Sequence, residues 1–149
     1  MGERSYETAI DISASSASVW ALLGEVTSWP TWTPTVTTVR PLGDPKLSQG
    51  AIFEVKQPGL PKAKFTVESC VDGQSFRWSS HSNGVHSSAD HVIESRGPKQ
   101  CQVTLKFTIT SRIVTVAWWM TRKRIRRYVD LEAQCLKAAA EKNERGSES

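Results

Sequence analysis

Three polar side chains that could hold a ligand or move a proton are predicted to lie on one face of a single β-hairpin. The dipeptide Asn83-Gly84 is a favoured two-residue hairpin loop, and alternating side chains on either side of it predict strands over 74–82 and 85–95. Because this turn fixes the register, even-numbered residues before it and odd-numbered residues after it point to the same side. The polar residues on that side are Ser80, Ser87 and His91. Hydroxyls can hydrogen-bond a carbonyl or hydroxyl group, and an imidazole is an effective general base near neutral pH.

Aromatic and aliphatic residues share that face, which favours an apolar pocket. They are Phe76, Trp78, Ala89 and Ile93. A polar group buried among such residues costs about 1–3 kcal/mol when it has no hydrogen-bond partner, so we expect water or a ligand to reach the two serines and the histidine. The alternative is a solid core that tolerates these polar side chains, with His91 hydrogen-bonded as a packing residue.

A second candidate for proton transfer lies on a long helix expected over 114–142. This segment has no glycine or proline and is rich in Ala, Leu, Glu, Lys and Arg. At about 100° per residue, its apolar stripe contains Ile125, Tyr128, Cys135, Leu136 and Ala139. Glu132 falls near the centre of the stripe. It either faces a cavity as a buried acid or reaches past the helix edge to water, and we favour the second.

The elements that must position these residues follow from periodicity and turn residues. Alternation predicts a first strand over 5–12, and hydroxyl residues can then cap a short helix over 16–26. Two prolines make Trp29 and Trp32 part of a tight aromatic corner over 28–34. Strands are expected at 36–42, 50–57, 62–70, 74–82, 85–95 and 101–110, as in an antiparallel meander.

This order of elements predicts an α+β fold with a cavity. A seven-stranded antiparallel sheet should curve around the long C-terminal helix, with two short helices after the first strand. Since one helix cannot fill so wide a concave face, a hollow should remain between sheet and helix.

Four segments carry a resemblance to a known superfamily. They are Ile10-Asp11-Ile12, Val19-Trp20-Ala21-Leu22-Leu23, Trp29-Pro30-Thr31-Trp32 and residues 131–141. The chain resembles the START-like, helix-grip SRPBCC proteins, in particular their polyketide cyclase/dehydrase-like branch. The resemblance implies a hollow binder and little more, because this superfamily includes lipid carriers, hormone receptors, cyclases and stress-related binders.

Binding of a small hydrophobic molecule, aromatic, polyketide-like or lipid-like, is therefore the first functional hypothesis. The residues expected to contact it are Phe53, Phe65, Trp78, Ser80, Ser87, His91, Phe107 and Tyr128. One alternative is an enzyme resembling aromatase/cyclases, in which His91 with Glu132 or a hydroxyl shuttles protons for aldol closure and dehydration. The sequence has no phosphate loop, nucleophile elbow or H-E-x-x-H motif, and the resemblance supplies no catalytic residue.

The start of the long helix combines aromatic with basic residues. The basic cluster consists of Arg122, Lys123, Arg124, Arg126 and Arg127, and it accounts for the whole net charge of +4. Beside Trp118 and Trp119 it allows a further alternative, a peripheral lipid-handling protein that contacts an anionic membrane. We favour a simpler interpretation, in which Trp32, Trp119 and Met120 close the pocket mouth and the basic residues are the solvent face of the helix. Nucleic-acid binding is not expected from one such patch.

Cysteine and histidine positions indicate neither disulfides nor a metal site. Cys70, Cys101 and Cys135 cannot all pair and form no C-x-x-C, so reduced thiols in the cytoplasm are expected. His81 and His86 should face each other across the hairpin, but they lack a closed set of ligands, and no metal or other cofactor is expected. Residues 1–142 are expected to form a single ligand-binding domain, monomeric or homodimeric, and 143–149 a disordered tail.

Overall fold

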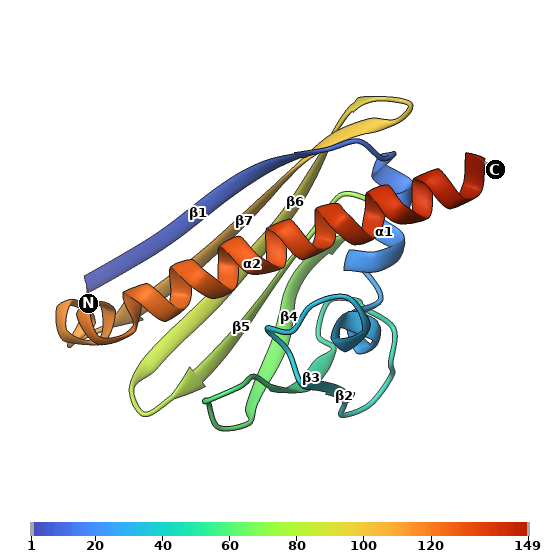
Figure 1. Cartoon of the computed structure of the whole chain (residues 1–149). Helices are drawn as coiled ribbons and strands as arrows, with labels where there is room; N and C mark the ends of the chain where they lie inside the picture. The colour runs from blue at the N-terminus through green and yellow to red at the C-terminus, as the bar shows by residue number, and fades with distance from the viewer. Residues whose placement is uncertain (1, 149) are drawn as a thin grey trace.

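Seven antiparallel strands form one curved sheet, and a long helix crosses its concave face (Figure 1). The computed structural model describes residues 2–148. The strands are β1 (Gly2–Ile12), β2 (Thr38–Pro41), β3 (Ile52–Lys56), β4 (Ala63–Val71), β5 (Ser75–Ser82), β6 (Val85–Gly97) and β7 (Gln100–Ser111). The helices are α1 (Ser16–Leu23), the 3-10 helix η1 (Val26–Thr31) and α2 (Val114–Glu148). The predicted α+β helix-grip fold is confirmed.

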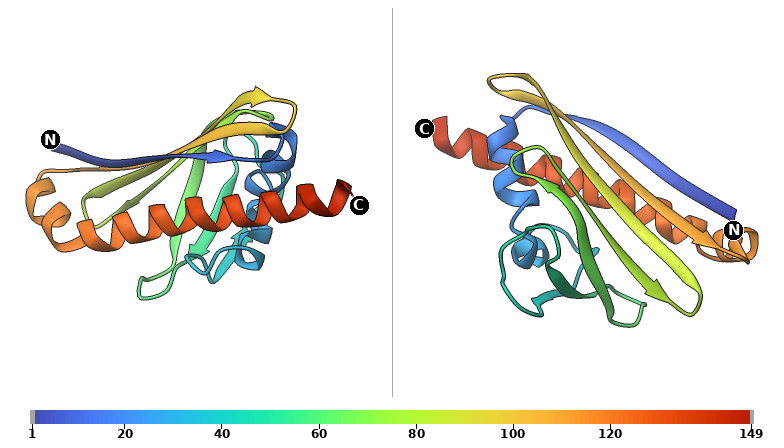
Figure 2. Two further views of the ribbon diagram at one scale, coloured as in Figure 1. Left: turned by 45° about the horizontal axis from the view of Figure 1, so that its top comes forward. Right: turned by 180° about the vertical axis from the view of Figure 1, so that it is seen from behind.

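The sheet order is β1-β7-β6-β5-β4-β3-β2. Strands β2 to β7 therefore form the predicted meander, and β1 joins it by pairing with β7 along its whole length. Each strand of the meander begins and ends within two residues of its predicted bounds. Figure 2 shows the sheet curving around α2, with α1 and η1 at the end where the helix leaves the sheet.

The β5–β6 hairpin has the register that its turn predicts. Asn83 (φ 52°) and Gly84 (φ 77°) both lie in the left-handed region, as the favoured two-residue hairpin turn requires. Phe76 consequently pairs with His91. The buried side of the hairpin carries Phe76, Trp78 and His91. The side predicted to contact a ligand therefore does point toward the interior.

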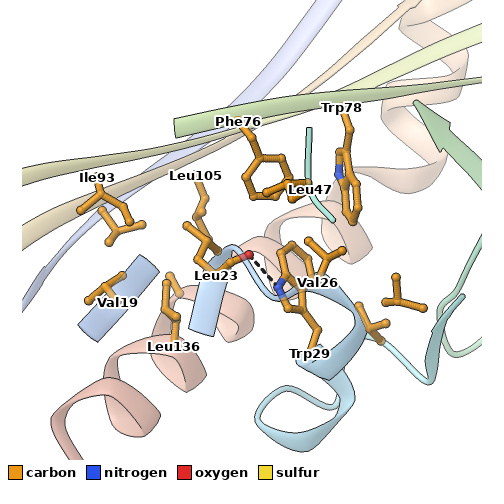
Figure 3. Packing of buried hydrophobic residues seen from close by; sticks show 14 of the residues in the cluster. Val19, Leu23, Val26, Trp29, Leu47, Phe76, Trp78, Ile93, Leu105 and Leu136 are labelled. Carbon is orange, nitrogen blue, oxygen red and sulfur yellow. Dashed lines mark hydrogen bonds between the residues drawn. The ribbon is translucent and has the colours of Figure 1, made fainter. Parts of the chain in front are cut away.

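Two short helices connect β1 to β2. The Ser15 hydroxyl caps α1, which ends at Leu23 rather than at the predicted residue 26, because the chain then tightens into η1. Trp29 in η1 is 2% exposed, and its indole Nε1 donates a hydrogen bond to the Leu23 carbonyl at 3.0 Å (Figure 3). Its ring lies 5.6 Å from that of Trp32. The predicted aromatic corner is confirmed, and it forms one end of the core.

The C-terminal half of α2 packs directly on the rest of the core. Ala133, Leu136 and Ala140 are buried there, together with Val19 and Leu23 of α1. Figure 3 shows Leu136 beside Val19 and Leu23. Two of these three buried residues in the C-terminal half of α2 are alanines, so the helix backbone can approach its neighbours closely.

The end of α2 differs from its prediction. The helix continues to Glu148, so the expected tail over 143–149 is wrong for 143–148, and Ser149 lies outside the described residues. The Ser18 hydroxyl of α1 donates a hydrogen bond to the Glu144 carboxylate at 2.7 Å. This contact joins two helices that are far apart in the sequence, so the composition of the last residues alone does not predict it.

Replacing Leu136 by Ala should lower the free energy of unfolding by about 2–5 kcal/mol, because it leaves a void where α2 is held against α1. Urea unfolding measures the difference. Gln134→Ala, at an exposed position of the same helix, is the matched control and should change stability by less than about 0.5 kcal/mol. Equal stability of the two variants would contradict the packing described.

Candidate functional site

A cavity of about 320 Å³ lies between the concave face of the sheet and the N-terminal half of α2. The predicted ligand-binding residues that line it are Phe65, Trp78, Ser87, His91, Phe107 and Tyr128. Phe53 and Ser80 do not line it. Phe53 is fully buried and packs against Trp78, with ring centroids 6.2 Å apart, while Ser80 is buried outside the cavity wall. An inward direction on a strand therefore places a residue in the core without deciding whether it reaches the hollow.

Aromatic rings form one end of the cavity. Trp78 of β5 is central, with its ring centroid 5.3 Å from Trp29 and 5.1 Å from Phe65. All three residues line the cavity, and Figure 3 shows Trp29 and Trp78 pointing toward each other from η1 and β5. Such a wall offers a large apolar surface to a planar ligand.

His91 is buried at this aromatic end and is held in one orientation. Its ring stacks on Phe76, with centroids 4.0 Å apart and planes 11° apart. Its Nδ1 lies 3.3 Å from the Phe76 carbonyl oxygen. Since a carbonyl only accepts, Nδ1 carries the proton and Nε2 is left as an acceptor. Burial among these rings lowers the pKa of His91 to about 3, so the imidazole is neutral at physiological pH.

Glu132 faces the same hollow from α2, and the prediction that it reaches water is wrong. Its side chain is 15% exposed, and its Oε2 lies 3.9 Å from Nε2 of His91. Burial raises the pKa of the carboxyl to about 8. The helix passes over the sheet at this point, so a side chain in the middle of the apolar stripe points into the cavity and is largely shielded from solvent.

His91 and Glu132 form a neutral acid and base pair. At neutral pH Glu132 carries a proton, while Nε2 of His91 has a free lone pair. Although the 3.9 Å separation would also suit an ion pair, the two pKa shifts both favour the uncharged forms. The distance exceeds that of a direct hydrogen bond, so each group can address a polar atom placed between them.

The part of the cavity next to the β3–β4 loop carries further polar groups and was only partly predicted. Tyr128 lies there, and its hydroxyl donates to the Pro58 carbonyl at 2.6 Å, joining α2 to the β3–β4 loop. The Arg124 guanidinium lies beside Gly59 in the same loop. Arg124 lines the cavity, which corrects the expectation that it belongs only to the solvent face of the helix.

The sequence did not predict some further residues that line the cavity. They include Thr35, Gln57, Leu60 and Thr121. The spacing of Thr121, Arg124, Tyr128 and Glu132 by three or four residues was a usable signal for the α2 members. Gln57 and Leu60 had no such signal, because their position depends on how the β3–β4 loop folds onto the helix. Thr35 had none either, since it lies in the irregular segment between η1 and β2.

The predicted pocket mouth is wrong. Trp119 and Met120 are 70% and 75% exposed and do not line the cavity. Helical spacing explains this, because the turns that direct Ala117 and Thr121 into the cavity direct Trp119 and Met120 away from it. Trp32 packs on Trp29 instead of bordering the cavity.

Residues 2–148 contain neither a cluster of metal-ligating side chains nor a helix that could span a membrane. This part of the chain contains no group of three or more His, Cys, Asp or Glu side chains arranged to hold a metal ion. The rings of His81 and His86 stack across the hairpin with centroids 4.2 Å apart. None of the described helices combines the length and apolar character needed to cross a bilayer.

Comparison with known families shows which family the chain belongs to. The family model described as polyketide cyclase/dehydrase and lipid transport matches residues 3–141. The chain belongs to this family. The resemblance seen in the sequence is thereby confirmed, and membership in the polyketide cyclase/dehydrase family supports a ligand-binding or cyclase role. No curated protein matches the sequence.

Solved structures similar to this member of the polyketide cyclase/dehydrase family include two kinds of enzyme. The Zhui aromatase/cyclase of a Streptomyces species has a TM-score of 0.78 at 15% identity, with 94% of each chain covered. A norcoclaurine synthase variant of Thalictrum flavum has a TM-score of 0.69 at 14% identity, covering 91% of this chain and 94% of that one. The di-domain aromatase/cyclase StfQ has a TM-score of 0.78 at 12% identity, covering 95% of this chain and 52% of that one. These identities show a shared fold alone.

The two buried groups should make opposite contributions to the pH dependence of stability. The contribution of His91 is complete above its ordinary pKa of 6.5 and is lost as the pH falls toward 3. The contribution of Glu132 is complete below its ordinary pKa of 4.5 and is lost as the pH rises toward 8. Relative to that of Glu132→Gln, the wild-type free energy of unfolding should therefore decrease as the pH rises from 4.5 to 8, by up to about 1.4 kcal/mol per pH unit.

Urea unfolding at a series of pH values measures this difference. The control is His91→Gln. This variant should be destabilised at alkaline pH as the wild type is, because it retains Glu132, but it should be destabilised less than the wild type at acid pH, because it lacks the imidazole. If Glu132→Gln showed the same alkaline loss as the wild type, Glu132 would not be the buried acid described.

Proposed function

We propose that the protein binds a compact hydrophobic molecule containing at least one ring in the cavity between the sheet and α2. The observation that carries this proposal is the 320 Å³ hollow with Trp29, Phe65 and Trp78 at one end. Ligand pockets span roughly 300–1,000 Å³. A cavity at the lower limit fits a small ring system better than a long acyl chain or a lipid with two chains.

The polar groups narrow the ligand further. At the aromatic end, protonated Glu132 can donate a hydrogen bond and His91 Nε2 can accept one. A carbonyl or hydroxyl group suits this end, whereas a carboxylate would lose its hydration there without gaining a cation. Arg124 lines the cavity beside the β3–β4 loop, so an acidic or strongly polar substituent belongs near this loop.

Filling the cavity from α2 should abolish binding. In Ala117→Trp the new indole enters the hollow, and we expect affinity for Nile red, a neutral aromatic dye, to fall at least roughly tenfold through lost apolar contact. Fluorescence titration measures it. Ala138→Trp, at an exposed position of the same helix, is the matched control and should bind like the wild type.

Equal Nile red affinity in both tryptophan variants would place the dye outside the cavity and contradict the proposal. Native mass spectrometry of the protein purified from its own host then identifies the natural ligand class. A bound mass that is lost in Ala117→Trp and kept in Ala138→Trp would assign that ligand to the cavity.

A second candidate function is favoured by the His91–Glu132 pair. In an enzyme of the cyclase or dehydratase kind, His91 Nε2 would take the proton next to a ketone, and Glu132 would give its proton to the β-hydroxyl, which leaves as water. A carbon–carbon double bond forms, and the imidazolium then returns its proton to the Glu132 carboxylate. Each charge develops opposite the other, which stabilises both.

Turnover separates this candidate from simple binding. His91→Gln and Glu132→Gln should each slow dehydration of a β-hydroxy ketone by about 10²–10⁴-fold, the usual range for general acid–base catalysis. Nile red affinity should change by less than about threefold, because the apolar wall is intact. The product enone is followed by its absorbance. His81→Gln, an exposed histidine outside the cavity, serves as the control, and wild-type turnover in the two cavity variants would exclude the acid–base role.

A further inference from the structure

The first turns of α2 expose a cluster of large apolar side chains. Its members are Ile113, Val116, Trp119 and Met120, and each is between 57% and 75% exposed. Single exposed apolar residues are ordinary on protein surfaces, whereas a contiguous group indicates an interaction site. Figures 1 and 2 place the start of α2 at one end of the molecule, beside the beginning of β1, so the cluster projects from that end.

Unpaired positive charge surrounds the cluster. From residue 112 to 129 the sequence has no aspartate or glutamate. Within the described residues, no ion pair involves Arg112, Arg122, Lys123 or Arg127. The guanidinium of Arg122 lies 5.9 Å from the ring centre of Trp119, so cation and aromatic belong to one surface.

The apolar and basic residues share one face of the helix. Val116, Met120, Lys123 and Arg127 follow each other at intervals of three or four, and their face is turned away from the one through Ala117, Thr121 and Tyr128 that lines the cavity. A helix segment with exposed apolar side chains, including a tryptophan, followed in the sequence by Lys or Arg has the composition of a segment that lies in a membrane interface. The face is therefore defined by Ile113, Val116, Trp119, Met120, Lys123 and Arg127, with Arg122 beside Trp119.

We propose that this face docks the protein on an anionic lipid membrane. Charge complementarity identifies the occupant, because two copies of the chain would bring like charges together, and nucleic acid would leave the apolar side chains without a partner. The inference goes beyond ligand binding and does not depend on the cavity's ligand. Ala117 and Thr121 line the cavity from the same turns of α2, so docking brings this wall within about one helix diameter, ~10 Å, of the lipid.

Co-sedimentation of the full chain with vesicles tests the proposal. Vesicles of phosphatidylcholine alone should retain little protein, and vesicles that also contain phosphatidylglycerol should retain it at low salt. Each basic side chain near such a surface is worth roughly fivefold in affinity. Neutralising Arg122, Lys123 and Arg127 to Gln should therefore weaken binding roughly 100-fold. The double variant Trp119→Ser, Met120→Ser should weaken it at least roughly tenfold.

Two matched variants serve as controls. Lys46, Lys64 and Lys142 are exposed and lie on other parts of the chain, so their triple replacement by Gln removes equal charge and should reduce binding far less. Leu42→Ser with Val71→Ser removes exposed apolar side chains elsewhere and should not matter. Lipids with brominated acyl chains should quench part of the wild-type fluorescence, and Trp119→Phe should lose that part.

The results of these experiments distinguish an anionic membrane from a second copy of the chain as the partner of this face. Failure to bind phosphatidylglycerol vesicles at low salt overturns the proposal, as does binding that ignores the Trp119 and Met120 substitutions. Dimerisation in solution that these substitutions abolish, without vesicle binding, would assign the face to a second copy instead. Nile red titration of the same variants keeps the two proposals apart, since loss of docking should leave dye binding unchanged.

Discussion

The cavity exists because α2 packs closely on the core along only part of its length. Ala133, Leu136 and Ala140 bring its C-terminal half into direct contact, and the Ser18–Glu144 hydrogen bond fixes that end to α1. From residue 115 to 132, by contrast, the structure buries no α2 side chain fully. The sheet is too wide and too curved for one helix to fill, so a space remains beneath the half of the helix that is not held against the core. The hollow is thus a consequence of where α2 packs directly on the core and where it does not.

The same desolvation that makes the cavity apolar sets the chemistry of its polar groups. Neither His91 nor Glu132 has a fixed counter-charge, so burial shifts both pKa values toward the neutral forms. Stacking on Phe76 and the Phe76 carbonyl determine which nitrogen of His91 is protonated. The resulting pair can receive a neutral polar group from either side. Retaining two ionisable groups at 3.9 Å in a core costs stability, and such a cost is characteristic of a functional site.

Local rules were enough to predict the framework of the fold. The Asn83-Gly84 turn determined the pairing of Phe76 with His91, and glycine-free, proline-free sequence predicted α2. The predictions failed where the position of a residue depends on the distance between one secondary-structure element and another. Helical projection placed Glu132 on the inward stripe, but whether water can reach it depends on the spacing of helix and sheet. Phe53 points inward as predicted, yet Trp78 stands between it and the hollow. The extension of α2 to Glu148 rests on a partner in α1, which no local pattern reveals.

The exposed face of α2 follows from the same geometry that lines the cavity. A helix of 3.6 residues per turn cannot direct Ala117, Thr121 and Tyr128 inward without directing Val116, Met120 and Lys123 away from the cavity. Polar side chains at these outward positions would satisfy the fold equally well, because the core makes no use of them. The presence of Val116, Trp119 and Met120 there, among cations without ion-pair partners in the described structure, is therefore not explained by folding or by the cavity. Since the two faces belong to the same turns, a partner bound to the outer face would lie directly behind one wall of the cavity.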